Sequence, residues 1–189
     1  MNVLFSLMIG IGLSAACGFR IFVPLLIMSI GSISGLLELS SNFAWIGTYT
    51  ALIVFLAATI IEITAYFVPW LDNILDTIAT PIAILAGITV MASCLHELSP
   101  LLKWSLSVIA GGSISGVIQV SSTVIRGVST GITGGLANFI VAGIEIIASI
   151  VISIIAIIFP IVAFIVVLIV LFIIACKKKK LMQKQRTQI

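Results

Sequence analysis

The sequence predicts an all-α, polytopic helical membrane protein with about five to seven membrane-embedded helices. Hydrophobic residues make up 61% of the 189 positions and charged residues only 8%, whereas soluble domains carry roughly 25% charged residues. The mean hydropathy is +1.40. Continuous apolar runs such as residues 161–175 do not show the alternation of a membrane barrel strand. Helices that cross lipid are therefore the expected architecture.

The first apolar run covers residues 2–37 and is too long for one straight span. A bilayer core of about 30 Å needs about 20 helical residues. Glycines and Pro24 interrupt this run, so we expect two helices, or two half-helices, that meet near Cys17-Gly18-Phe19-Arg20.

The clearest full span extends from Ala44 to Val68, with Trp45 and Tyr66 near its ends as interfacial anchors. Pro69 follows and predicts a break. Residues 69–78 then have the pattern of a short amphipathic helix that lies in the membrane interface.

Three further apolar segments complete the membrane region. Residues 79–95 are short for a span, and residues 101–122 are long enough but contain three glycines. Residues 139–176 would form a helix of about 57 Å, almost two bilayer cores, so we divide them at Phe159-Pro160. The resulting prediction is one membrane domain over residues 1–176.

The last thirteen residues form a basic tail, 177–189, which contains six of the nine basic residues. A basic cluster directly after an apolar run predicts a cytoplasmic C-terminus, and it could attract anionic lipid headgroups. The expected location is the bacterial cytoplasmic membrane, and the expected partner is the bilayer rather than nucleic acid. The three cysteines are isolated in apolar stretches and no ligand spacing is present, so neither a metal nor a cofactor is predicted.

Arg20 and Arg126 are the most informative charged residues, because each lies in an apolar region next to glycines. A charge at the bilayer centre costs about 2.5–3.5 kcal/mol on insertion scales. Glycine-broken helices would offer free backbone groups and helix N-termini to an anion. The functional interpretation is an anion-binding pocket with Arg20 and Arg126. The structural interpretation is a pair of buried salt bridges to Glu62 and Glu145.

The segments Gly10–Arg20 and Arg126–Gly135 share glycines, serines and one arginine. Each half of the chain also has a glutamate within an apolar helix, Glu62 or Glu145. Paired interrupted helices are typical of transporters with inverted repeats, and shared glycine enrichment is the alternative explanation. Glu62 and Glu145 would be charge-balancing or proton-linked groups.

Other polar residues suggest smaller roles. Ser129 and Thr130, close to Gly134-Gly135, could bind an anion through hydroxyls and backbone amides, or could belong to a loop at the membrane edge. Asp72 and Asp76 share one helix face, as a solvated surface or as a pair of charge-balancing or lipid-processing carboxylates. No catalytic motif is present.

Three segments together resemble an uncharacterised bacterial membrane family, named only as a domain of unknown function (number four-one-two-six). The resemblance covers roughly residues 5–170 and is carried by these segments: Gly12–Arg20 with Phe22-Val23-Pro24, Glu62 with Val68–Asp72 and Asp76, and Arg126–Asn138.

The chain departs from the family pattern at three places. Phe139 stands where the family usually has proline, Ala142 and Ile146 lie where it has an acidic pair, and Ala65-Tyr66-Phe67 has no aspartate. The arginines, Asp72, Asp76 and Glu145 are retained, and the resemblance adds Asn138 to the expected binding residues. It implies the fold and leaves the activity open.

The leading functional expectation is a small transporter or permease-like protein for an anionic solute or lipid headgroup. The alternative is a non-transporting membrane scaffold or accessory subunit, whose charges act only as structural pairs.

Overall fold

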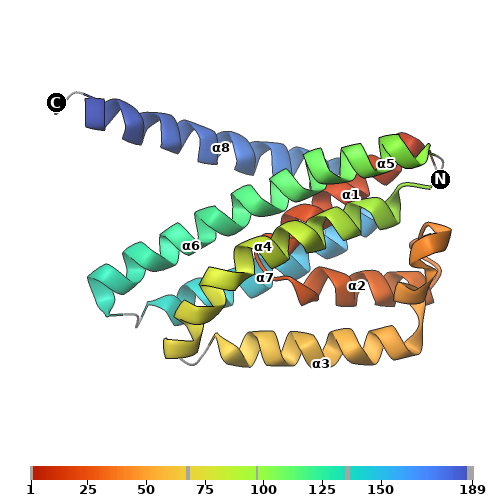
Figure 1. Ribbon diagram of the computed structural model, residues 1–189, viewed down its shortest axis with the longest axis horizontal. Helices are drawn as coiled ribbons and strands as arrows, with labels where there is room; N and C mark the ends of the chain where they lie inside the picture. Colours follow the sequence, from red (N-terminus) through yellow and green to blue (C-terminus); the bar gives the residue numbers. More distant parts are fainter. Residues whose placement is uncertain (1, 67–68, 97, 135–136, 187–189) are drawn as a thin grey trace.

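The computed structural model describes residues 2–66, 69–96, 98–134 and 137–186, and this part of the chain is all-helical (Figure 1). The elements are α1 Val3–Cys17, α2 Phe22–Ile33, the 3-10 helix η1 Ser41–Gly47, α3 Tyr49–Ala65, α4 Pro69–Cys94, α5 Pro100–Leu106, the π-helix η2 Ser107–Gly112, α6 Ser113–Thr133, α7 Asn138–Ile158 and α8 Pro160–Arg186.

The lengths of these helices agree with a helical membrane protein. Within the described residues, three helices are long and apolar enough to cross a membrane: Pro100–Thr133, Asn138–Ile158 and Pro160–Lys177. Helices η1 and α3, which are bent by 65° relative to each other, raise the number of candidate spans to four if the pair counts as one span. Three shorter apolar helices accompany them, Val3–Cys17, Phe22–Ile33 and Ile78–Cys94.

Helices α1 and α2 form a hairpin whose turn lies near the middle of the molecule (Figure 1). At 15 and 12 residues, they are about 22 and 18 Å long, shorter than a bilayer core. The prediction of two helices that meet near Cys17–Arg20 is confirmed, and their lengths are those of half-helices.

Helix α3 starts later than the predicted span from Ala44 to Val68. Residues 41–47 form η1, and α3 begins only at Tyr49, after Thr48 accepts a hydrogen bond from the Ala51 amide at 3.2 Å. A threonine in this N-cap position starts a helix, and that signal competes with the apolar run that suggested a start at Ala44. Trp45 therefore precedes the span and is 53% exposed.

Helix α4 corrects the prediction of a separate interfacial helix over residues 69–78. Pro69 begins a single 26-residue helix that continues to Cys94 with Pro81 inside it. Proline is well accommodated at the first helical position. A proline inside a membrane helix is also tolerated, because surrounding groups can satisfy the backbone groups that it frees. The aspartates changed the polarity of the segment but did not end the helix.

The helix that begins at Pro100 is also longer than predicted. It passes through η2 and runs to Thr133 as 34 residues, so glycines 111, 112 and 116 do not interrupt it. These glycines instead permit close packing on α4. A Cβ at Gly111 would lie 2.5 Å from the Gly87 carbonyl oxygen, and one at Gly112 would lie 2.9 Å from Ile88. Small residues at such contacts are a common device of membrane helices.

The centre of the bundle is α1, which contacts α4, α6, α7 and α8. Its position depends on small residues: a Cβ at Gly12 would lie 2.6 Å from the Ala156 side chain. The Ser14 hydroxyl donates to the Gly87 carbonyl at 2.9 Å, and the Ser149 hydroxyl donates to the Ala16 carbonyl at 3.1 Å. Packing and hydroxyl hydrogen bonds thus hold α1 between its neighbours.

The division at Phe159-Pro160 is confirmed, because α7 ends at Ile158 and α8 starts at Pro160. Helix α8 lies at the edge of the bundle and diverges from it towards the C-terminus (Figure 1). It continues as a helix to Arg186, so the backbone does not change at the start of the basic tail.

Candidate functional site

Arg20 lies in the turn of the α1–α2 hairpin and is completely buried. The turn fits closely against α6, since a Cβ at Gly18 would lie 2.6 Å from the Ile118 side chain and 2.7 Å from the Ser115 carbonyl oxygen. A residue with a side chain would push the turn away from α6. Gly18 thereby allows the guanidinium of Arg20 to reach the interior of the bundle.

Arg126 reaches the same place from α6 and is 1% exposed. Its Nε donates to Glu145 Oε1 at 3.2 Å, and its Nη2 forms an ion pair with Glu145 Oε2. Ser122, one turn earlier on α6, donates its hydroxyl to Glu145 Oε1. Arg126 and Ser122 thus bind the carboxylate of α7 together.

Glu145 also binds Arg20, and this joins the two arginines in one cluster. Arg20 Nη2 lies 3.0 Å from Glu145 Oε2 and donates to the Ala142 carbonyl oxygen at 3.3 Å. One carboxylate therefore contacts two guanidiniums that are separated by more than a hundred positions in the sequence. The predicted pairing of an arginine with Glu145 is present, with both arginines involved.

Tyr66 completes the cluster from the end of α3. Its ring centroid lies 3.8 Å from Arg20 Cζ and 4.2 Å from Arg126 Cζ, distances at which a cation is attracted to an aromatic ring. Tyr66 is only 5% exposed, so the expectation of an interfacial anchor is wrong. An interfacial anchor and a buried aromatic residue give the same sequence pattern at the end of an apolar run. Only the packing of α3 against the cluster distinguishes the two.

Glu62 has a different role from Glu145. Its two carboxylate oxygens accept hydrogen bonds from the amides of Ile21 at 2.8 Å and Phe22 at 3.0 Å. These amides belong to the N-terminus of α2, which has no other acceptor within its own helix, and a negative charge there is favourable. The helix end that was expected to attract an anion is thus already occupied by a side chain of the protein.

Arg20 retains two nitrogen atoms, Nε and Nη1, that have no hydrogen-bond partner in the part of the chain that the structure describes. Buried donors without a partner are rare and unfavourable. The cost in free energy of an unsatisfied donor is larger for a charged guanidinium than for a neutral group. The unsatisfied groups of the cluster are donors, and their complement is an oxygen acceptor.

Arg126 does not lie at a glycine-broken helix, contrary to the prediction. Helix α6 is regular through Arg126 and ends only at Thr133, before Gly134 with a φ of +64°. A Cβ at Gly127 or Gly131 would meet no other helix within 4 Å among the described residues, so these glycines permit a helix without shaping a site. The two arginines therefore lie in different local structures, a turn and a helix interior, and the internal repeat stays a prediction.

Ser129, Thr130 and Asn138 lie beyond Arg126, where α6 turns into α7. The Asn138 amide donates to the Thr130 hydroxyl at 2.9 Å, and the Gly134 amide donates to the Thr130 carbonyl at 2.9 Å. The Ser129 carbonyl accepts from the Thr133 hydroxyl at 2.8 Å. These hydrogen bonds link the end of α6 to the start of α7.

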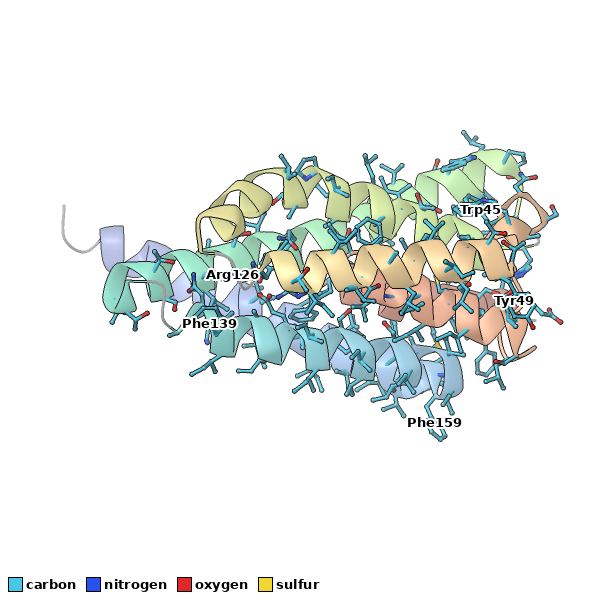
Figure 2. All side chains as sticks on the ribbon, turned by 90° about the horizontal axis from the view of Figure 1, so that it is seen from below. Trp45, Tyr49, Arg126, Phe139 and Phe159 are labelled. Atoms are coloured by element: carbon cyan, nitrogen blue, oxygen red, sulfur yellow. The ribbon has the colours of Figure 1, made fainter. Side chains whose placement is uncertain are left out.

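Figure 2 shows Arg126 near the end of α3, far from Trp45 and Tyr49 at its other end. Phe139, at the position where the family resemblance would place a proline, lies at the start of α7 and is 40% exposed. Asp72 and Asp76 are in the first turns of α4, but their side chains lie outside the described residues. No group of three or more His, Cys, Asp or Glu side chains in the described part of the chain could hold a metal ion.

Comparison with protein families matches residues 7–179 to the family described as Domain of unknown function (DUF4126). The chain belongs to the DUF4126 family. Comparison with curated proteins and with solved structures finds no significant match.

The three segments that carry the DUF4126 resemblance come together at this site. The first supplies Gly18 and Arg20, the second supplies Glu62, and the third supplies Arg126. The sequence did not indicate that Tyr66 and Ser122 belong to this site. Ser122 had a detectable signal, because it precedes Arg126 by four residues and so shares its helix face.

Proposed function

We propose that this protein is a small transporter or permease-like membrane protein that binds an anionic solute or lipid headgroup at Arg20 and Arg126. The observation that carries the proposal is the convergence of two buried guanidiniums on the single carboxylate of Glu145, while two nitrogens of Arg20 have no acceptor in the part of the chain that the structure describes. A phosphate or carboxylate oxygen is the acceptor that matches a guanidinium best.

The α1–α2 hairpin supports transport rather than simple adhesion to the membrane. Its turn carries Arg20 near the middle of the molecule (Figure 1), and both helices are too short to cross the bilayer core. Discontinuous helices that meet at mid-depth frame the substrate sites of many transporters. The helix pair that brings Arg20 to mid-depth is the element that would have to move during transport.

Glu145 would compete with the substrate. It occupies the position between the guanidiniums that an anion would take, so an arriving anion either binds Arg20 at its two free nitrogens or displaces the carboxylate. Before an anion arrives, the Tyr66 ring contacts both guanidiniums, at 3.8 and 4.2 Å from its centroid.

A second function, a membrane scaffold or accessory subunit, is favoured by one specific observation. Arg20 and Arg126 are accompanied by the two carboxylates Glu145 and Glu62, so these four groups have no net charge. A cluster that is neutral without a ligand would also serve to join α2, α3, α6 and α7.

Ligand-induced stabilisation separates the two functions. Purified protein in detergent is titrated with inorganic phosphate, with acetate and with phosphatidylglycerol, and Tm is measured for the wild type and for Arg20→Gln. A ligand that binds only the folded state at a hundred times its Kd stabilises by about 2.7 kcal/mol. Transport is then measured as flux of the stabilising anion into proteoliposomes.

Lys103→Gln is the matched control, because Lys103 is the other buried basic side chain among the described residues and donates to the Ser40 hydroxyl at 2.5 Å, away from the cluster. The proposal expects a stabilisation that Arg20→Gln abolishes and Lys103→Gln retains. No stabilisation by any anion, or one equal in all three proteins, would support the scaffold instead.

A further inference from the structure

A cleft of about 310 Å³ lies beside the arginine cluster, between the start of α2, the second half of α3 and the middle of α4. Apolar side chains form most of its wall, including Phe22, Ala58, Ile61, Ala79 and Ile82. Its volume is at the small end of the range for ligand pockets, which suits part of a single chain-like molecule.

The cleft opens on the outer surface of the bundle. Helices α3 and α4 follow each other in the chain but contact each other little, and the side chains at the opening, Ile61, Ile78 and Ile82, are 67%, 47% and 40% exposed. In a bilayer these side chains would meet hydrocarbon. Water has few polar partners in such a cleft, whereas a lipid chain fills it without loss of hydrogen bonds.

The inner wall of the cleft adjoins the arginine cluster. Glu62 and Tyr66 are its two polar lining residues among those described. Both oxygens of Glu62 already accept backbone amides, so Glu62 is not an open site for a cation. Arg20 Cζ lies 3.8 Å from the centroid of the Tyr66 ring, and two Arg20 nitrogens have no hydrogen-bond partner among the described residues.

We propose that the cleft binds one hydrocarbon chain of an anionic membrane lipid whose headgroup oxygens accept hydrogen bonds from Arg20. The inference rests on the proposed function, since it uses the same arginine, and it assigns the substrate class. The lipid enters sideways between α3 and α4, and a displacement of the Tyr66 ring joins the cleft to Arg20. An anionic headgroup complements this end of the cleft, because Arg20 has donors there without an acceptor among the described residues.

The test fills the cleft and leaves the arginines unchanged. Ala58→Trp places a large side chain on the cleft wall, while Ala57→Trp places the same side chain on the neighbouring exposed position of α3, outside the lining. Stabilisation by phosphatidylglycerol, by phosphatidylcholine and by inorganic phosphate is titrated for both variants and for Arg20→Gln. Ala58→Leu repeats the measurement with a smaller obstruction in case the tryptophan variant does not fold.

The expected result has three parts. Phosphatidylglycerol stabilises the wild type and Ala57→Trp at concentrations at least tenfold lower than it stabilises Ala58→Trp or Ala58→Leu. Arg20→Gln loses this stabilisation, and phosphatidylcholine stabilises the wild type at least tenfold less effectively than phosphatidylglycerol.

The opposite results distinguish this inference from the proposed function. If Arg20→Gln abolishes the effect of phosphatidylglycerol or phosphate while Ala58→Trp and Ala58→Leu respond as the wild type does, the anion site stands and the cleft assignment is overturned. If both lipids stabilise equally and Arg20→Gln changes nothing, the headgroup assignment fails, and with it the use of Arg20 as the anion site. Absence of any response to phosphatidylglycerol in the wild type also overturns the inference.

Discussion

At the scale of single residues, the most unusual feature of the protein is a small cluster of buried charges. Glu145 receives hydrogen bonds or ion pairs from Arg20, Arg126 and Ser122, and Tyr66 contacts both guanidiniums. Buried charges of this kind stabilise little when all partners are present, but removing one partner is strongly unfavourable. The cluster is therefore a sensitive point of the fold whatever it binds.

Glu145→Gln is expected to lower the free energy of unfolding by about 3–5 kcal/mol, because it leaves two buried guanidiniums without their shared carboxylate. The double variant Glu145→Gln with Arg126→Gln should recover part of this loss, which a double-mutant cycle in detergent would measure. Glu38→Gln is the control, since Glu38 is exposed and surface changes usually stay within about 0.5 kcal/mol. Additive effects of the two single changes would contradict the shared cluster.

At the scale of elements, glycine has two different uses in this chain. On α4 and η2 it permits two helices to touch: a Cβ at Gly87 would lie 2.6 Å from the Gly111 carbonyl oxygen, and it would also meet the Ser115 side chain. On α6 and α7, a Cβ at Gly127 or Gly143 would meet no other helix within 4 Å in the described part of the chain. The same residue type marks a packing surface in one helix and open space in another.

Gly87→Ala should destabilise the protein by about 1–3 kcal/mol, the usual effect of an extra group in a close-packed contact. Gly143→Ala should be neutral or stabilising by up to about 1 kcal/mol, because alanine favours a helix more than glycine does. Both positions lie inside helices, so the pair separates packing from helix propensity when Tm is compared in the same detergent. Equal effects of the two changes would show that α4 and η2 are not in close contact.

At the scale of the whole molecule, the arrangement places the α6–α7 connection and the C-terminal end of α8 at one end, and the N-terminus and the α2–α3 connection at the other (Figure 1). The basic tail that starts at Lys177 predicts that the first end faces the cytoplasm. The α1–α2 turn that carries Arg20 lies between these two ends, near the middle of the molecule (Figure 1).

Cysteine labelling of intact cells tests this orientation. Leu36→Cys and Ile132→Cys place thiols at exposed positions, 68% and 78% accessible, towards opposite ends of the molecule. In a Cys176→Ser background, where the other two cysteines are buried, a membrane-impermeant maleimide should label only Leu36→Cys in intact cells. Ile132→Cys should react only after the membrane is opened, and the reverse pattern would place the basic tail outside.

Sequence alone determined the solvent of this protein, its helical class and two of its chain reversals. A chain with 61% hydrophobic residues has too few charges to cover a surface in water, and backbone groups in lipid must be satisfied within helices. The turn at Gly18–Arg20 and the break at Pro160 were readable because glycine and proline change what the local backbone can do. Arg20, Arg126, Glu62 and Glu145 were recognisable because charges are rare in apolar segments.

The tertiary structure decided everything that depends on contacts between distant segments. Gly87 and Gly127 look alike in the sequence, yet of these two only Gly87 meets a neighbouring helix among the described residues. The glycines beside Arg126 therefore did not reveal from the sequence that α6 continues through them. That Tyr66 turns inward, that Glu62 caps α2 and that Glu145 joins both arginines follows from the packing of α2, α3, α6 and α7. These partners lie 19 or more positions apart, and such separations leave no local pattern in the sequence.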